Sequence, residues 1–253
     1  MKMLTFLVLV VTNILLCQVA GEDYEETACL DCQQLLQKQN KIINQLSQKV
    51  RNLEATPRSG AEWTLAFRGT AYIGKSVYDA YKDGTGIPRE VEPGCKQVTD
   101  PLPCKNHYRN SEVFDNWERV QEVAFILYSN YQKVKEILFD GTKTNYMTWF
   151  DKSKVKFSSW NQLKDTQTNI FSISGDIRVN LKRAFYINNL YNGCEDKGWF
   201  VALDMAYGSC PYEKIDRFPV FLYARHNQPE NFNSGALDKA DTMAIFVKYY
   251  STP

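Results

Sequence analysis

The residues from Cys29 to Leu53 constrain the fold of this chain most strongly, because their apolar side chains repeat with the period of a coiled coil. Heptad position a is occupied by Leu36, Ile43 and Val50, and position d by Gln39, Leu46 and Leu53. Extending the register by one heptad toward the N-terminus places Cys29 at a and Cys32 at d. We therefore predict a helical stalk whose apolar seam and two thiols face a second helix.

The stalk is short, so it is expected to need association with other chains. An isolated helix of about 25 residues is only marginally populated in water. Disulfides between chains would offset this weakness, which predicts that Cys29 and Cys32 form interchain bridges. A redox centre, half of a zinc site and a bridge within one chain are the alternatives for the Cys-x-x-Cys spacing. Ile or Val at a with Leu at d favours a homodimer.

The first residues have the pattern of a secretory signal peptide. Lys2 precedes an apolar run over residues 4–16, and small residues follow at 19–21. The run is shorter than the about 20 residues of a membrane span, and a retained signal anchor is the alternative. We divide the chain into a signal peptide (1–21), a coiled-coil stalk (22–56), a hinge containing Pro57 and Gly60 (57–62) and a globular head (63–253).

The cysteine content agrees with a secreted protein. Of seven cysteines, Cys17 lies in the predicted signal peptide and two lie in the stalk, which leaves four in the head. Four cysteines allow three pairings. We favour the pairs closest in sequence, Cys95 with Cys104 and Cys194 with Cys210, because each closes a loop punctuated by Pro or Gly.

The charge balance argues against two classes of partner. The chain has 30 Lys and Arg against 29 Asp and Glu, and loss of Lys2 with the signal peptide would make the two numbers equal. A chain without net positive charge is not expected to bind nucleic acid or an anionic membrane surface.

The sequence has no Gly-x-Ser-x-Gly nucleophile motif, no His-Glu-x-x-His zinc motif and no phosphate-binding loop. The two histidines, His107 and His226, lie far apart, and each is expected to have a packing or surface role. Glu195 and Asp196 are expected in a solvated turn. Residues 140–145 resemble a calcium loop only faintly, since they lack its glycine and distal glutamate. We predict a protein without enzymatic activity, cofactor or bound metal, and an enzyme is the least favoured alternative.

Short apolar runs predict a β-rich head. Residues 63–68 alternate in polarity, and residues 120–128 and 134–139 read as a hairpin. Further strands are predicted at 171–173, 184–187, 199–203, 220–223 and 243–249. Residues 73–81 are predicted as a short helix or loop, and residues 90–109 as a surface loop stapled by a disulfide. The predicted class is an α+β, mostly antiparallel head behind the coiled-coil helix.

Several short motifs of the head suggest a family. They are Trp63-Thr64-Leu65-Ala66-Phe67-Arg68-Gly69, Ser76-Val77-Tyr78-Asp79-Ala80, Asn106-His107-Tyr108-Arg109, Phe139-Asp140-Gly141-Thr142, Trp149-Phe150 and Ala240-Asp241-Thr242-Met243. In these motifs the head resembles a domain of secreted coral and other cnidarian proteins that include skeletal organic matrix proteins. Trp63, Arg68, Tyr78 and the Cys194–Cys210 loop are similar, more weakly, to fibrinogen-related domains. The calcium-binding segment of those domains is missing, so calcium-dependent recognition is not implied.

The resemblance implies a secreted structural component of an extracellular matrix, possessing no catalytic residue. Its setting would be a skeletal matrix, and its partners would be matrix proteins, glycans or a mineral surface. The alternative is a lectin-like or pattern-recognition module that presents several heads on associated stalks. For that alternative, the candidate glycan platform is Trp149, Trp160 or Tyr191 beside polar loops, although a core position is the favoured interpretation for each of the three.

Overall fold

The computed structural model describes residues 33–34, 37–43, 63–178 and 180–250. The chain forms two compact units, Met1–Leu53 and Glu54–Pro253. In the first unit, residues 33–34 and 37–43 are helical, and the seam residue Ile43 is 38% exposed in the single chain. The predicted signal peptide and hinge, Cys29, Cys32, Leu36, Leu46, Val50 and Leu53 lie outside the described residues. None of the described helices is long and apolar enough to cross a membrane.

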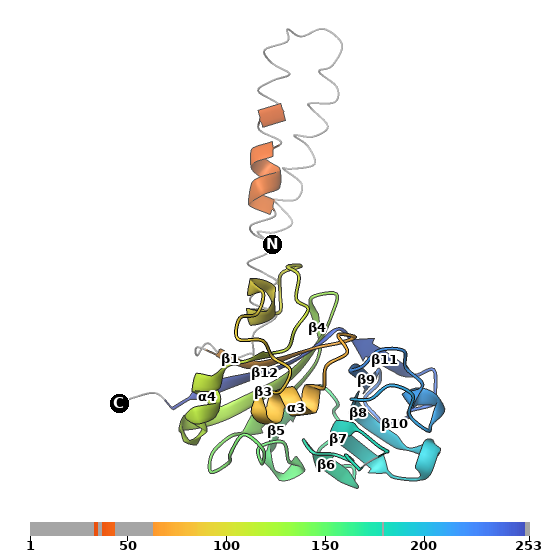
Figure 1. Cartoon of the computed structure of the whole chain (residues 1–253). Helices are drawn as coiled ribbons and strands as arrows, with labels where there is room; N and C mark the ends of the chain where they lie inside the picture. The colour runs from red at the N-terminus through yellow and green to blue at the C-terminus, as the bar shows by residue number, and fades with distance from the viewer. Residues whose placement is uncertain (1–32, 35–36, 44–62, 179, 251–253) are drawn as a thin grey trace, which may run out of the picture. The chain divides into compact units, whose positions relative to one another are not determined.

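The second unit is built on two sheets in which every strand pair is antiparallel (Figure 1). Sheet A has the order β2-β1-β12-β3-β4-β5, and sheet B has the order β11-β9-β8-β7-β6, with β10 paired to β8. The strands of sheet A are β1 (Thr64–Thr70), β2 (Tyr108–Arg109), β3 (Val120–Ser129), β4 (Gln132–Asp140), β5 (Val155–Ser158) and β12 (Thr242–Tyr249). Those of sheet B are β6 (Ile170–Ser172), β7 (Arg183–Leu190), β8 (Lys197–Leu203), β9 (Val220–Ala224), β10 (Glu230–Asn231) and β11 (Leu237–Ala240). The predicted β-rich head is confirmed.

Helices are short in this unit. The α-helices are α3 (Val77–Asp83) and α4 (Ser111–Asp115). The 3-10 helices are η1 (Pro93–Lys96), η2 (Trp117–Arg119), η3 (Lys152–Lys154), η4 (Gly193–Glu195) and η5 (Pro211–Glu213). Residues 90–109, predicted as a surface loop, contain η1 and β2, and both Cys95 and His107 are fully buried. The disulfide-closed, mostly irregular loop is confirmed, but the segment also packs on β1 through η1 and β2, which the prediction did not include.

Aromatic side chains from both sheets form one core. Phe125 of sheet A has its ring centroid 5.0 Å from that of Phe200 and 6.3 Å from that of Phe185, both in sheet B. Phe139 of sheet A lies 6.1 Å from Phe171 of sheet B. The inner faces of the two sheets therefore pack against each other, and ring pairs at these separations add to the stabilisation from buried area.

A bulge in β1 decides which residues face this core. The pairing of β1 with β12 matches Leu65 to Phe246 and Phe67 to Ile245, so that one extra residue of β1 lies between them. Phe67 belongs to the core between the sheets, whereas Leu65 packs with Phe246 on the other face of sheet A. Arg68 pairs with Ala244, which also belongs to that outer face.

The predicted hairpin is confirmed as β3 and β4, and its turn explains an unusual backbone. Ser129 pairs with Gln132, leaving Asn130 and Tyr131 as the two turn residues. Their φ angles are 49° and 63°. Positive φ at both positions is the type I′ geometry, whose twist matches that of antiparallel strands. Asn adopts this region readily, but Tyr does so only under constraint.

The carboxylate of Asp204 joins sheet B to α3. Asp204 directly follows β8 and accepts hydrogen bonds from the backbone N–H groups of Val77 (2.8 Å) and Tyr78 (2.9 Å) and from the Ser76 hydroxyl (2.5 Å). Ser76 Oγ in turn accepts from Asp79 N, which makes Ser76 the N-cap of α3. Burial raises the pKa of Asp204, and the three donors act in the opposite direction.

Replacing Asp204 by alanine is expected to lower the free energy of unfolding by about 2 kcal/mol. The backbone N–H groups at the buried N-terminus of α3 would then lose their hydrogen-bond acceptor. The measurement is urea unfolding followed by tryptophan fluorescence. Asp83→Ala is the matched control, since Asp83 is exposed and its hydrogen bonds within the described part of the chain go to Thr85 in its own turn. Equal effects of the two substitutions would contradict the role given to Asp204.

Candidate functional site

A pocket with a volume of about 260 Å³ lies where β1 ends, beside the turn between β3 and β4. Arg68, Thr70 and Tyr72 line it from β1 and the residues that follow. Asn130 and Tyr131 line it from the hairpin turn, and Asp241 and Thr242 from the start of β12. The pocket is therefore assembled from segments that are distant in sequence.

The disulfide loop supplies another wall of the pocket. Cys95 is bonded to Cys104, and Val98, Leu102 and Cys104 line the pocket. The loop folds tightly on itself, since a Cβ at Gly94 would lie 2.4 Å from the carbonyl oxygen of Pro103. Thr70 Oγ1 donates to the carbonyl of Asn106 (2.8 Å), which ties the end of this loop to β1. The disulfide and this hydrogen bond thus fix the position of the loop that lines this side of the pocket.

Arg68 is a buried cation in this pocket. The residue is 5% exposed, and its Nη1 donates to the carbonyls of Gly94 and Gln97 in the disulfide loop. Its Nε is buried without a hydrogen-bond partner, and no carboxylate of the described residues forms an ion pair with it. Burial lowers the pKa of Arg68 to about 10, and the neighbouring Tyr131 has a smaller, opposite effect. A buried donor that lacks an acceptor is rare in proteins and is costly.

Two tyrosines with constrained backbones form the rim of the pocket. Tyr72 and Tyr131 are 39% and 40% exposed, with φ angles of 60° and 63°. Tyr72 N donates to the carbonyl of Pro219 (2.9 Å), and Asn130 N donates to Asp241 Oδ2 (2.7 Å). Left-handed backbone at residues other than glycine costs about 1–3 kcal/mol and is concentrated at functional sites. Both tyrosines thus line the pocket from constrained backbone positions and remain accessible to solvent.

His107 is joined to the pocket through the pocket-lining residue Thr70. Its Nδ1 accepts from the backbone N–H of Thr70 (3.0 Å), and its Nε2 donates to the carbonyl of Lys75 (3.0 Å). This pair of bonds requires the neutral imidazole, and burial lowers the pKa of His107 to about 4. The ring also stacks on Phe67. The expected packing role of His107 is confirmed, whereas His226 is exposed and lies 3.2 Å from Glu230.

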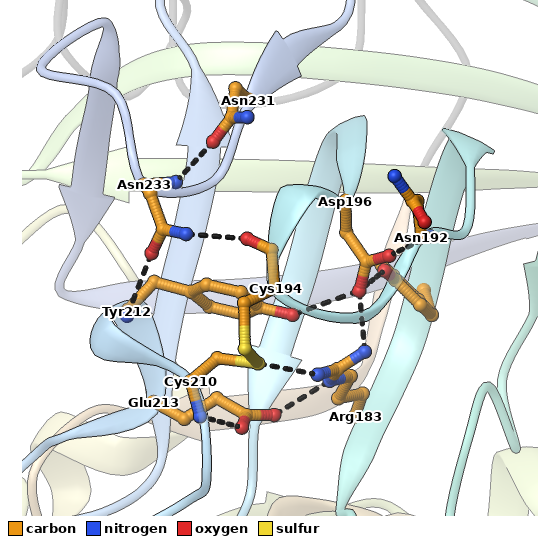
Figure 2. Close-up of a disulfide and its surroundings, with 10 residues drawn as sticks. Arg183, Asn192, Cys194, Asp196, Cys210, Tyr212, Glu213, Asn231 and Asn233 are labelled. Carbon is orange, nitrogen blue, oxygen red and sulfur yellow. Dashed lines mark hydrogen bonds and ion pairs between the residues drawn. A yellow bond between two sulfur atoms is a disulfide. The ribbon is translucent and has the colours of Figure 1, made fainter.

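The second disulfide covers a buried network of charges (Figure 2). Cys194 is bonded to Cys210, the other pair favoured by spacing. Beside it, Arg183 Nη1 bonds to Asp196 Oδ2 (2.5 Å) and Arg183 Nε to Glu213 Oε1 (2.6 Å). Burial acts to lower the pKa of Arg183, but the bond to Glu213 and the surrounding charges raise it.

Both carboxylates of this network have further donors. Asp196 accepts from the hydroxyls of Tyr186 (3.2 Å) and Tyr212 (3.0 Å) and from Asn192 N (2.6 Å), as Figure 2 shows in part. Glu213 Oε2 accepts from Cys210 N (2.9 Å). The prediction that Asp196 lies in a solvated turn was wrong, because Asp196 is fully buried. The charged groups of this network are therefore already paired within the protein, and we assign the network a structural role.

The residues expected to form a glycan platform lie elsewhere. Trp149 and Trp160 are fully buried, and their Nε1 atoms donate to the Tyr81 hydroxyl (2.8 Å) and to the carbonyl of Ala224 (2.9 Å). The core position that the sequence favoured for both tryptophans is confirmed, so neither forms a surface platform. Tyr191 is half-buried and donates its hydroxyl to Asp176 (2.6 Å). The sequence analysis missed Arg68, Tyr72 and Tyr131 as site residues, although an arginine inside an apolar strand was a visible signal.

The described residues contain no cluster of three or more His, Cys, Asp or Glu side chains arranged to hold a metal ion. Comparison of the chain with protein-family models, curated proteins and solved structures finds no match. The resemblances to coral matrix proteins and fibrinogen-related domains therefore stay predictions. The pocket at Arg68 is the feature from which function is argued.

Proposed function

We propose that this protein is a secreted, non-enzymatic component of an extracellular matrix, whose head binds another matrix molecule in the pocket at Arg68. The observation that carries the proposal is the buried Arg68 with an unpaired N–H in a pocket rimmed by exposed tyrosines. Binding sites combine apolar and aromatic walls with a few fixed polar groups, and this pocket has both.

The disulfides support the secreted setting. Both pairs of the head are formed, Cys95 with Cys104 and Cys194 with Cys210. Disulfides persist in oxidising compartments, and most cytosolic proteins lack them. This agrees with the predicted signal peptide. The skeletal setting is supported by the family resemblance alone.

The stalk would make weak binding by one head effective. If two or more heads are joined, binding of a second head becomes intramolecular, and avidity exceeds single-site affinity by about 10²–10⁴. The lectin-like alternative uses the same architecture and differs in taking a glycan as the ligand. With Trp149 and Trp160 buried, its site would be the same pocket.

The first test is retention of the full-length secreted protein on matrix material. Immobilised glycosaminoglycan, collagen and calcium carbonate particles are compared, with Leu102→Glu as the pocket variant and Leu190→Glu as the control. Leu102 lines the pocket, whereas Leu190 does not, and the two are similarly exposed (48% and 41%). We expect retention on an organic component that is lost in Leu102→Glu only. Equal retention of both variants, or retention on mineral alone, would rule the proposal out.

Replacement of both Cys29 and Cys32 by serine is expected to abolish covalent multimers while leaving the head folded. Light scattering and non-reducing gels measure the number of linked chains. Retention on a multivalent surface should fall by about 100-fold or more, because single heads lose avidity. A bridge within one chain predicts instead that the chain count is unchanged.

A further inference from the structure

The chemistry of the pocket indicates the charge of its ligand. Nη1 of Arg68 is already engaged by two backbone carbonyls, so its remaining binding edge is formed by Nε and Nη2. Of this edge, Nε is buried and has no hydrogen-bond partner among the described residues. Two parallel N–H groups on one edge match the two oxygens of a carboxylate.

The charge of Arg68 is also not balanced within the pocket. Asp241 is the carboxylate that lines it, and Asp241 Oδ2 accepts from Asn130 N instead of pairing with Arg68. Taking a cation out of water is unfavourable unless an anion compensates it. The lowered pKa of Arg68 reports this unfavourable burial. A ligand that brings a negative charge would supply the missing partner.

The rim indicates the rest of the ligand. The rings of Tyr72 and Tyr131 are accessible at the opening, and such rings present an apolar face with a polar hydroxyl. Asn130, Asp241 and Thr242 add amide, carboxylate and hydroxyl groups. A sugar ring has an apolar C–H face and a polar edge of hydroxyls, so it matches both. A volume of about 260 Å³ suits one ring, because pockets for larger ligands start near 300 Å³.

We infer that the pocket binds the carboxylate of an acidic sugar unit, with Arg68 as the anion-binding residue and Tyr72 and Tyr131 against the ring. This inference rests on the proposed function and narrows its ligand class. A uronic acid at the end of, or within, a matrix polysaccharide has this chemistry. An acidic peptide side chain shares the carboxylate but lacks the ring and its hydroxyls.

The test is calorimetric titration of the full-length protein with two matched sugars. Methyl glucuronide and methyl glucoside differ only in the carboxylate, and N-acetyl-aspartate amide serves as the peptide acid. We expect the glucuronide to bind more tightly than the glucoside by about 10-fold or more, as is usual when a charged hydrogen bond is gained. Similar binding of the two sugars overturns the inference, as does equal or tighter binding of the peptide acid.

Variants assign the effect to the pocket. Arg68→Gln should remove the preference for the glucuronide, and Arg225→Gln, an exposed arginine elsewhere, should keep it. Because Arg68→Gln also removes bonds to the disulfide loop, Leu102→Glu is a second variant that leaves Arg68 in place and repels an anion. If neither variant weakens binding of the glucuronide, the inference is wrong. If no probe binds but matrix retention is still lost in Leu102→Glu, the ligand class is wrong and the proposed function stands.

Discussion

Replacing Arg183 by methionine is expected to lower the free energy of unfolding by about 3–5 kcal/mol, the usual effect of leaving buried charges without their partner. The side chains of Arg183, Asp196 and Glu213 are at most 2% exposed, and the single guanidinium serves both carboxylates. Methionine fills much of the same space, so the expected loss comes mainly from the unpaired carboxylates. Urea unfolding at neutral pH, followed by circular dichroism, measures it.

The matched control is Arg225→Met. Arg225 also binds a carboxylate, that of Asp238, but their side chains are 52% and 36% exposed. Pairs of this kind contribute about 1 kcal/mol or less. Adding Asp196→Asn and Glu213→Gln to Arg183→Met should restore part of the loss, because the buried charges are then removed. Equal destabilisation by Arg183→Met and Arg225→Met would show that the buried network does not matter for stability.

Acidification from pH 6.5 to pH 4 is expected to lower the contribution of His107 to stability by about 3 kcal/mol. The pKa of His107 is lowered from 6.5 to about 4 by burial, so the unfolded chain takes up a proton in this window and the folded chain does not. Stability from this group is therefore complete above pH 6.5 and is lost as the pH falls toward 4. Protonated Nδ1 could no longer accept from Thr70 N, which is why the folded state resists the proton.

Urea unfolding at several pH values in this window, for the parent and for His107→Gln, isolates the effect. Glutamine retains an acceptor and a donor but does not titrate. The free energy of unfolding of His107→Gln should therefore depend less on pH than that of the parent, and the difference is the contribution of His107. His226→Gln is the control, because His226 is 61% exposed and should leave the slope unchanged. If His107→Gln retained the full slope, the buried neutral histidine would not be its source. Thr70 lines the pocket, so loss of this support should also weaken ligand binding at low pH.

The sequence predicted those features that depend on local pattern. The hairpin of β3 and β4 and the two disulfides follow from alternation, turn residues and cysteine spacing. Asp196 was misplaced because a carboxylate next to Glu195 and Gly198 looks like a turn. Its burial depends on Arg183 and Tyr186 of β7 and on Tyr212 of η5, which the fold brings together in space.

The pocket could not be predicted, for two physical reasons. First, the bulge between Leu65 and Phe67 changes the face of β1 on which each side chain lies, so simple alternation assigns Leu65 and Phe67 to the same face. Second, its walls come from the end of β1, the disulfide loop, the hairpin turn and the start of β12. Only the antiparallel pairing of distant segments places these next to one another.

The position of β12 in sheet A also bears on how the protein is made. β12 lies between β1 and β3, and it pairs with both along most of its length. Until residues 242–249 have been synthesised, β1 and β3 each present an unpaired edge, and the contact that closes the sheet spans almost the whole head. We therefore expect sheet A to close only after β12 has been synthesised. Chaperones that protect strand edges would act before that point, and substitutions in β12 should reduce the yield of folded protein more than equally destabilising ones in β4.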